Sequence, residues 1–140
     1  MASVSRLLTL KFLPLWPDLS LLLLRVWFGG LLLLLHGWMK ISMYGAMSQK
    51  FADPFGIGSP ASLALSIFAE AVCSSLIVVG LFTRFAAFVC IINMTTAFVI
   101  VHGSALKGPK GGELAFLYLG VFIALLLAGP GRFSIDGNLR

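Results

Sequence analysis

The sequence predicts an all-α integral membrane protein, an antiparallel four-helix bundle with a short N-terminal interfacial helix. Two observations predict this class. Hydrophobic residues make up 59% of the 140 residues and charged residues only 11%, whereas soluble domains average about 25% charged residues. Four apolar segments are also long enough to cross about 30 Å of hydrocarbon as helices. A transmembrane barrel would instead show alternating segments of about ten residues.

The four spans are expected at residues 19–39, 61–82, 85–104 and 113–128, within one transmembrane domain that covers residues 1–140. Only "TR" separates the second span from the third, so these two must form an antiparallel hairpin. Ahead of the first span, the basic and leucine-rich "SRLLTLKFLPLWPD" predicts an interfacial helix that Pro14 and Pro17 stop. The connection over residues 41–60 carries "FADPFGIGSP", which indicates a loop lying against the membrane face.

The net charge of +5 reflects membrane topology and anchoring rather than nucleic-acid binding, because the basic residues are scattered at the ends of apolar runs. With four spans, both termini share one side of the bilayer. That side carries five basic residues and the other side four; the five are Arg6, Lys11, Arg84, Arg132 and Arg140. The positive-inside rule therefore favours cytoplasmic termini by a single charge.

Small residues and cysteines inside the spans are interpreted as packing residues. Gly29 in the first span, and Gly120 with Ala124 in the fourth, are expected to let helices approach closely. Cys73 and Cys90 fall inside apolar runs without C-x-x-C or metal-ligand spacing. We therefore expect no metal site.

Glu70 raises the main functional question, because it lies near the middle of an apolar span. Insertion scales assign roughly +2.5 to +3.5 kcal/mol to Asp, Lys or Arg at the bilayer centre, so such a residue is usually paired or functional. Arg25 and His36 are eleven residues apart on the first span, which puts them on one helical face. Glu70 falls between them in height. We expect it to face the bundle interior without a close cation, linked to His36 or Arg25 through polar groups or water.

Polar residues also gather at the two ends of the bundle. Near the outer end, by this topology, the expected group is His36, Lys40, His102 and Glu113. It has three interpretations: contact with headgroups and water, a pocket for a quinone ring or small anion with Glu70 relaying protons, or a haem between His36 and His102 that nothing else in the chain requires. At the inner end we expect a closing salt bridge among Arg84, Arg132 and Asp136.

Four pieces of the chain, taken in order, resemble the DoxX family of small four-helix membrane proteins. They are "LLLLRVWFGGLLLLLHGWMK", "FAEAVCSSLIVVGLFTRFAAF", "VHG" and "GELAFLYLGVFIALLLAGPGRFSID", and the resemblance covers Leu21 to Asp136. It implies a multi-pass protein of the bacterial plasma membrane. The family is named for a membrane subunit associated with thiosulfate:quinone oxidoreductase, and relatives in the wider superfamily act as assembly or trafficking factors.

Two functions therefore stay open. The first is a membrane subunit of a quinone-linked oxidoreductase system that binds quinone in the bundle, with a partner subunit delivering electrons. The second is a non-catalytic accessory, structural or assembly subunit of a larger membrane complex. The chain has no Fe–S cysteine set and no nucleotide-binding glycine motif, so a quinone reaction needs electrons from a partner. Whether the chain is an enzyme is left undecided by its sequence.

Overall fold

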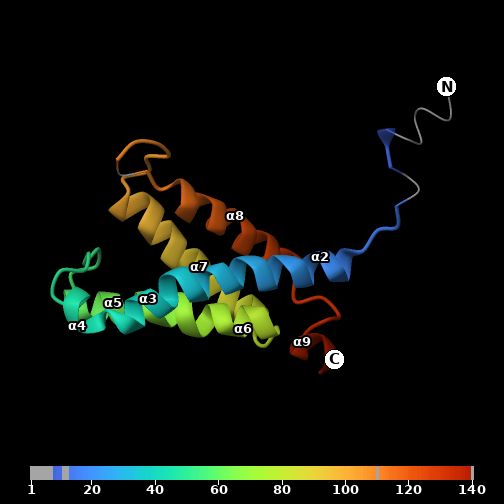
Figure 1. Cartoon of the computed structure of the whole chain (residues 1–140), viewed down its shortest axis with the longest axis horizontal. Coiled ribbons are helices and arrows are strands. Elements are labelled where there is room, and N and C mark those ends of the chain that lie inside the picture. Colours follow the sequence, from blue (N-terminus) through green and yellow to red (C-terminus); the bar gives the residue numbers. More distant parts are fainter. Residues whose placement is uncertain (1–7, 11–12, 110, 140) are drawn as a thin grey trace.

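The computed structural model of the chain describes residues 8–10, 13–109 and 111–139. Every regular element in these residues is a helix, as the sequence predicts (Figure 1). Four long helices follow one another along the chain. Helix one comprises α2 (Pro17–Leu24), the π-helical segments η1 (Arg25–Gly29) and η2 (Leu32–Gly37), and α3 (Trp38–Ser42).

The remaining elements complete the chain as follows. Helix two comprises α5 (Ser59–Ile67), the π-helical segment η3 (Phe68–Cys73) and α6 (Ser74–Val79). Helix three comprises α7 (Thr83–Thr96) and the π-helical segment η4 (Ala97–Val101), and helix four is α8 (Glu113–Ala128). Two short helices, α4 (Tyr44–Met47) and α9 (Ile135–Asn138), lie outside these four.

Helices one, two and three are each long and apolar enough to cross a membrane, with 26, 21 and 19 residues. Helix four is also apolar but has 16 residues, or about 24 Å of rise, which is less than a hydrocarbon core of about 30 Å. The described residues therefore contain three helices of spanning length and one shorter apolar helix.

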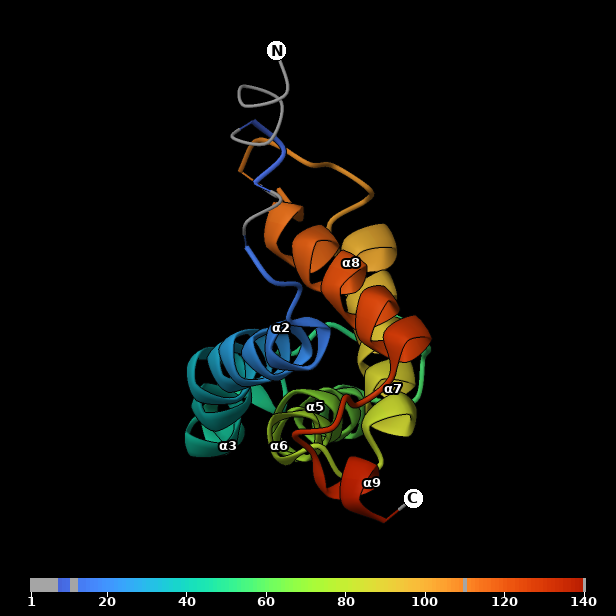
Figure 2. The ribbon, with the colours of Figure 1, turned by 90° about the vertical axis from the view of Figure 1, so that its right-hand side faces the viewer.

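The four helices form two antiparallel pairs. Helices one and two lie side by side, and α7 and α8 cross them as a second pair (Figures 1 and 2). One end of the assembly, here the terminal end, holds the starts of α2 and α7 and the ends of α6 and α8. The opposite end, here the loop end, holds α3, α4, the start of α5 and the connection into α8.

Proline and glycine set several helix ends. Pro17 stands at the start of helix one, where its missing N–H costs nothing. Gly80 ends α6 with a positive φ of 76°, and Leu81 N donates to Leu76 O at 2.9 Å. The expected interfacial helix lies largely on residues 1–7 and 11–12, outside the described residues. Near it, Leu13 N donates to Leu10 O at 2.8 Å in a turn.

Helices one and two approach closely along a stripe of glycines. A Cβ placed on Gly37 would lie 2.7 Å from the carbonyl carbon of Glu70 and 2.8 Å from Ala71 N, so the two backbones touch there. Two turns earlier, a Cβ on Gly29 would lie 3.0 Å from a Val78 methyl group. The expectation for helix four is wrong, because Gly120 is exposed with no described atom within 4 Å of an added Cβ, and Ala124 is exposed as well.

The loop before helix two is held by one carboxylate. Asp53 accepts hydrogen bonds from Gly58 N at 2.8 Å, Ile57 N at 3.1 Å and Ser62 Oγ at 2.7 Å. The hydrogen bond from Ser62, followed by that from Gly58, holds the pKa of Asp53 below its ordinary value of 3.8. Asp53 therefore fastens the loop to the first turns of α5.

Gly37→Ala is expected to destabilise the fold by about 1–3 kcal/mol, because the added methyl group overlaps the Glu70 backbone and must push helices one and two apart. Gly30→Ala is the matched control: it lies on the same helix in open space, where alanine favours a helix over glycine. Thermal unfolding in detergent measures the difference. Equal stability of the two variants would contradict a backbone contact at Gly37.

Acidification is expected to release the loop that Asp53 fastens. Because the folded-state pKa is depressed, the ionised carboxylate stabilises the loop above the ordinary Asp pKa near 3.8, and this stabilisation is lost as pH falls below it. The amide NMR shifts of Ile57 and Gly58, whose N–H groups donate to this carboxylate, should therefore change on acidification. Ser62→Ala removes the largest cause of the pKa shift, so it should move the midpoint of this change to higher pH. An unchanged pH profile in that variant would contradict this assignment.

Candidate functional site

Glu70 lies in η3 with 5% of its surface exposed, and polar groups surround its carboxylate. Its Oε2 forms an ion pair with Lys40 Nζ. Its Oε1 accepts hydrogen bonds from Ser66 Oγ at 3.2 Å and Asn93 Nδ2 at 3.1 Å. The four side chains come from helices one, two and three, and we call them the Glu70 network: Lys40, Ser66, Glu70 and Asn93.

Local helix geometry brings these groups together. Ser66 precedes Glu70 by four residues, one turn, so the two side chains share a face of helix two. Gly37 lets helix one touch the backbone of Glu70, and Lys40 follows three residues later on the same face. Glu70 itself lies in a π-helical segment, a departure from regular α-helix that is frequent at functional sites.

The sequence-based expectation for the environment of Glu70 is wrong in one respect. We expected no close cation, and a link to His36 or Arg25, but the cation is Lys40. The backbone contact at Gly37 puts Lys40 only three residues, about 4.5 Å of helical rise, beyond the level of Glu70. A lysine side chain is long and leans toward the start of its helix, so its ammonium group reaches back to the carboxylate. Lys40 Nζ also donates to Ser66 Oγ at 3.0 Å and lies 5.6 Å from the centre of the Phe51 ring.

A cavity of about 430 Å³ lies beside the Glu70 network and is called here the lateral pocket. All four network residues line it, together with His102 and the loop residues Phe51 and Phe55. Its remaining walls are largely apolar. Four of the apolar lining residues on helices two and three are 41–55% exposed, namely Leu65, Phe68, Ile92 and Val101. The pocket thus has apolar rim residues on the outer surface of the helices and a polar network inside.

The four residues expected at the loop end occupy different places. Lys40 and His102 line the lateral pocket. His36 packs edge-on against the Tyr118 ring of α8, with 6.2 Å between ring centres, and is absent from the residues that line the pocket. Glu113 is exposed in the first turn of α8. Gly112 packs against His102, since a Cβ on Gly112 would lie 2.9 Å from the His102 Cβ.

The structure adds partners that the sequence analysis did not place in the site: Ser66, Asn93 and Phe51. The sequence features that could have pointed to these three residues are weak. A serine one turn before a buried glutamate is a local clue, whereas Asn93 and Phe51 depend on how helix three and the loop fold back. Among residues 8–10, 13–109 and 111–139, no three His, Cys, Asp or Glu side chains gather into a group that could hold a metal ion.

Arg25 is fully buried at the terminal end. Its Nη2 donates to Phe133 O, and its guanidinium lies over Gly80, where a Cβ would be 3.0 Å from the Arg25 Cζ. Asp136 is the acidic group that attracts it electrostatically. The Nε and Nη1 atoms of Arg25 have no hydrogen-bond partner within the described part of the chain. Glycine at position 80 is therefore required both by the turn and by the arginine.

Asp136 ties the C-terminal segment to the turn between helices two and three. Its carboxylate accepts from Phe82 N at 2.9 Å and Thr83 N at 2.8 Å, and so caps the start of α7. Its own N donates to Gly80 O at 2.9 Å. We expected Arg84 and Arg132 to share in closing this end. Arg84 Nε donates to Leu126 O at 3.0 Å, and Arg132 N donates to Asp18 Oδ1 at 2.8 Å.

Comparison with known proteins places this arrangement in a family. The family model described as DoxX matches residues 20–103, which include helix one from its fourth residue, helices two and three, and the whole Glu70 network. A protein of Haemophilus influenzae, described as an uncharacterized protein, is 34% identical over 116 residues, covering 75% of this chain and 80% of its own length. No solved structure matches the chain. The family match and this relative together show that the chain belongs to the DoxX family, as its motifs suggest.

Proposed function

We propose that the chain is a membrane subunit of a quinone-linked oxidoreductase system, and that the lateral pocket holds the quinone ring. One observation carries the proposal: a pocket of about 430 Å³ combines apolar walls, a buried polar network and a rim of exposed apolar residues. A ligand that enters from the lipid and carries a polar ring on an apolar tail fits all three features. Quinones have this chemistry.

The donors in the pocket suit the carbonyl oxygens of a quinone. Lys40 Nζ and Asn93 Nδ2 are N–H donors, each with more hydrogens than the contacts to Glu70 use. His102 is a further polar group on the wall. Because Lys40 and Glu70 form an ion pair, their charges cancel, and a neutral ring is a better match than an anion. On reduction of the bound ring, the ammonium of Lys40 gives it a proton, and the Glu70 carboxylate takes up a replacement proton and returns it to Lys40.

The cellular setting is part of the same proposal. The whole chain is taken as one transmembrane domain in a bacterial plasma membrane, with its termini in the cytoplasm. Electrons come from a partner subunit, because the chain has no Fe–S cysteine set or nucleotide-binding motif of its own. Other membrane subunits are therefore expected to associate with it.

A second candidate is a non-catalytic accessory or assembly subunit. It is favoured by the hydrogen bonding of Glu70, whose two oxygens together bind groups from three helices. Such a network holds the helices in register whether or not a ligand binds. The two functions predict different results for two changes. Filling the pocket should lower quinone binding, and replacing Glu70 with a residue that cannot titrate should lower quinone reduction, only if the chain is a quinone-linked subunit.

Filling the pocket tests the quinone proposal. We expect the purified chain to bind a ubiquinone or menaquinone analogue at one per chain. Ala97→Phe should weaken this binding about tenfold or more, because the ring occupies space on the pocket wall. Ala124→Phe, an exposed position on α8, is the matched control and should leave binding unchanged. Equal binding by both variants would remove the pocket as the quinone site.

Glu70→Gln tests the proton step and separates the two candidate functions. Glutamine keeps an oxygen for Lys40 but cannot titrate. The variant loses part of the stabilisation that the ion pair provides, so folding, subunit assembly and quinone binding are measured first and should persist at reduced thermal stability. Quinone reduction by the assembled complex should fall by about 10²–10⁴-fold, the usual contribution of a positioned acid or base. Ser75→Ala is the control, because the Ser75 hydroxyl donates to Ala71 O within its own helix. Full activity of Glu70→Gln would leave Glu70 as a structural residue.

A further inference from the structure

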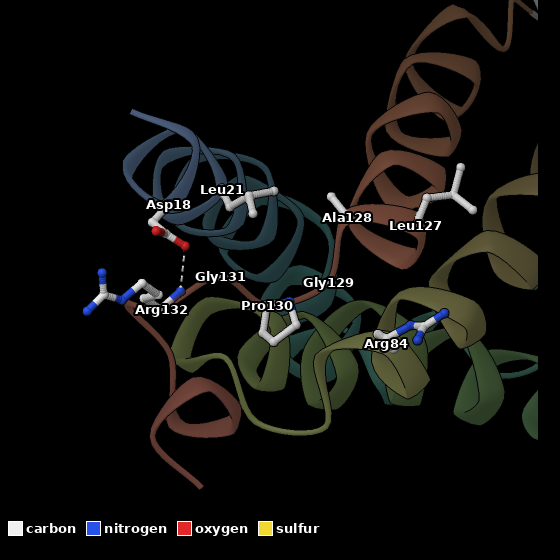
Figure 3. Close-up of a pocket in the computed structure, with 9 residues that line it drawn as sticks. All are labelled: Asp18, Leu21, Arg84, Leu127, Ala128, Gly129, Pro130, Gly131 and Arg132. Carbon is white, nitrogen blue, oxygen red and sulfur yellow. Dashed lines mark hydrogen bonds between the residues drawn. The ribbon is translucent and has the colours of Figure 1, made fainter. Parts of the chain in front are cut away.

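A second cavity of about 430 Å³ lies at the terminal end, separate from the lateral pocket (Figure 3). It is bounded by the first turns of α2 and α7 and by the chain that leaves α8. Three charged residues and several apolar ones line it; those that matter here are Asp18, Leu21, Arg84, Leu127, Pro130 and Arg132. None of these residues belongs to the Glu70 network.

The two arginines flank the cavity from opposite sides, with Pro130 between them in Figure 3. Arg84 is anchored, because its Nε donates to Leu126 O at 3.0 Å in the last turn of α8, where a cation is favourable. The Arg132 side chain is exposed and extends outward from the rim. Its backbone N donates to Asp18 Oδ1 at 2.8 Å, whereas its guanidinium has no hydrogen bond to another residue in the part of the chain that the structure describes, so the guanidinium can turn toward a ligand.

The charge of the cavity favours an anion. Two arginines and one aspartate leave one net positive charge among the lining residues. The Asp18 carboxylate accepts a backbone hydrogen bond, which offsets part of its negative field. Guanidinium groups present several N–H donors in a plane and bind phosphate oxygens in pairs.

Apolar side chains stand beside these charges. Leu127 is 77% exposed in the last turn of α8, and Trp16 is 60% exposed at the start of α2. Exposed tryptophan and arginine at a helix end mark the level of the lipid headgroups. A ligand here lies between the two arginines and beside exposed hydrocarbon.

We propose that this end cavity binds the phosphodiester of an anionic phospholipid. Arg84 contacts the phosphate from the α7 side, Arg132 closes over it from the C-terminal segment, and the acyl chains run along the exposed leucine of α8. The bound lipid lies where the two helix pairs meet, so it covers the joint between helix one and the end of helix four. This site is independent of quinone binding.

The test uses the full-length chain in nanodiscs made of equal parts phosphatidylcholine and phosphatidylglycerol. After exchange into detergent, lipid retained on the protein is quantified by mass spectrometry. The wild type should retain phosphatidylglycerol in preference to phosphatidylcholine. Arg84→Gln and Arg132→Gln should each lower the retained phosphatidylglycerol about fivefold, the effect expected for one basic residue near a membrane surface. Lys50→Gln, exposed at the loop end, is the control and should retain the wild-type amount.

Two results would overturn the proposal. Equal retention of both lipids by the wild type would show that headgroup charge is not recognised. Displacement of phosphatidylglycerol by inorganic phosphate at millimolar concentration, with the same dependence on Arg132, would identify a site for free phosphate instead. Arg132→Gln is decisive if Arg84→Gln fails to fold, because only the exposed side chain of Arg132 changes and its backbone bond to Asp18 remains. Quinone binding measured on the same variants should stay at the wild-type level.

Discussion

The buried ion pair between Lys40 and Glu70 is the interaction on which the rest of the site depends. A lone carboxylate at this depth costs several kcal/mol, and Lys40 offsets that cost from the neighbouring helix. The pairing needs helices one and two in contact, and Gly37 permits this because no side chain stands between its backbone and that of Glu70. Asn93 then adds helix three to the same carboxylate. One glycine and four polar side chains thereby fix three helices.

The lateral pocket follows from this arrangement. Helices two and three both meet Glu70, and the loop carrying Phe51 folds over Lys40. The space left between them has its polar groups inside and its apolar rim outside. Asp53 fastens the same loop through three hydrogen bonds. The loop, the ion pair and the pocket are therefore connected, and a change in any of them should alter the affinity of the pocket for a ligand.

The terminal end is closed mainly through backbone groups. Asp136 caps α7, Arg25 binds Phe133 O, and Gly80 lies at the centre of these contacts. The motifs "GLFTR" and "GPGRFSID" therefore lie together in space although about fifty residues separate them, as the contacts of Asp136 show. The chemistry of the two ends differs accordingly: the terminal end is held by caps and turns, whereas the loop end carries the polar pocket.

The sequence by itself determined the all-helical membrane class, the positions of four apolar helices and the interior placement of Glu70. Composition and the lengths of apolar runs indicate these features without any knowledge of how the helices pack. Only the tertiary structure decided which groups Glu70 binds. Helical rise placed His36 and Arg25 as its candidates, but the backbone contact at Gly37 and the reach of the Lys40 side chain made the ammonium group its partner. Likewise, the positions of His36 and His102 along helix one and after helix three do not say which neighbours they face. His36 faces Tyr118 and His102 the lateral pocket, since rotation of a helix about its axis is set by packing across the bundle and not by its own residue spacing.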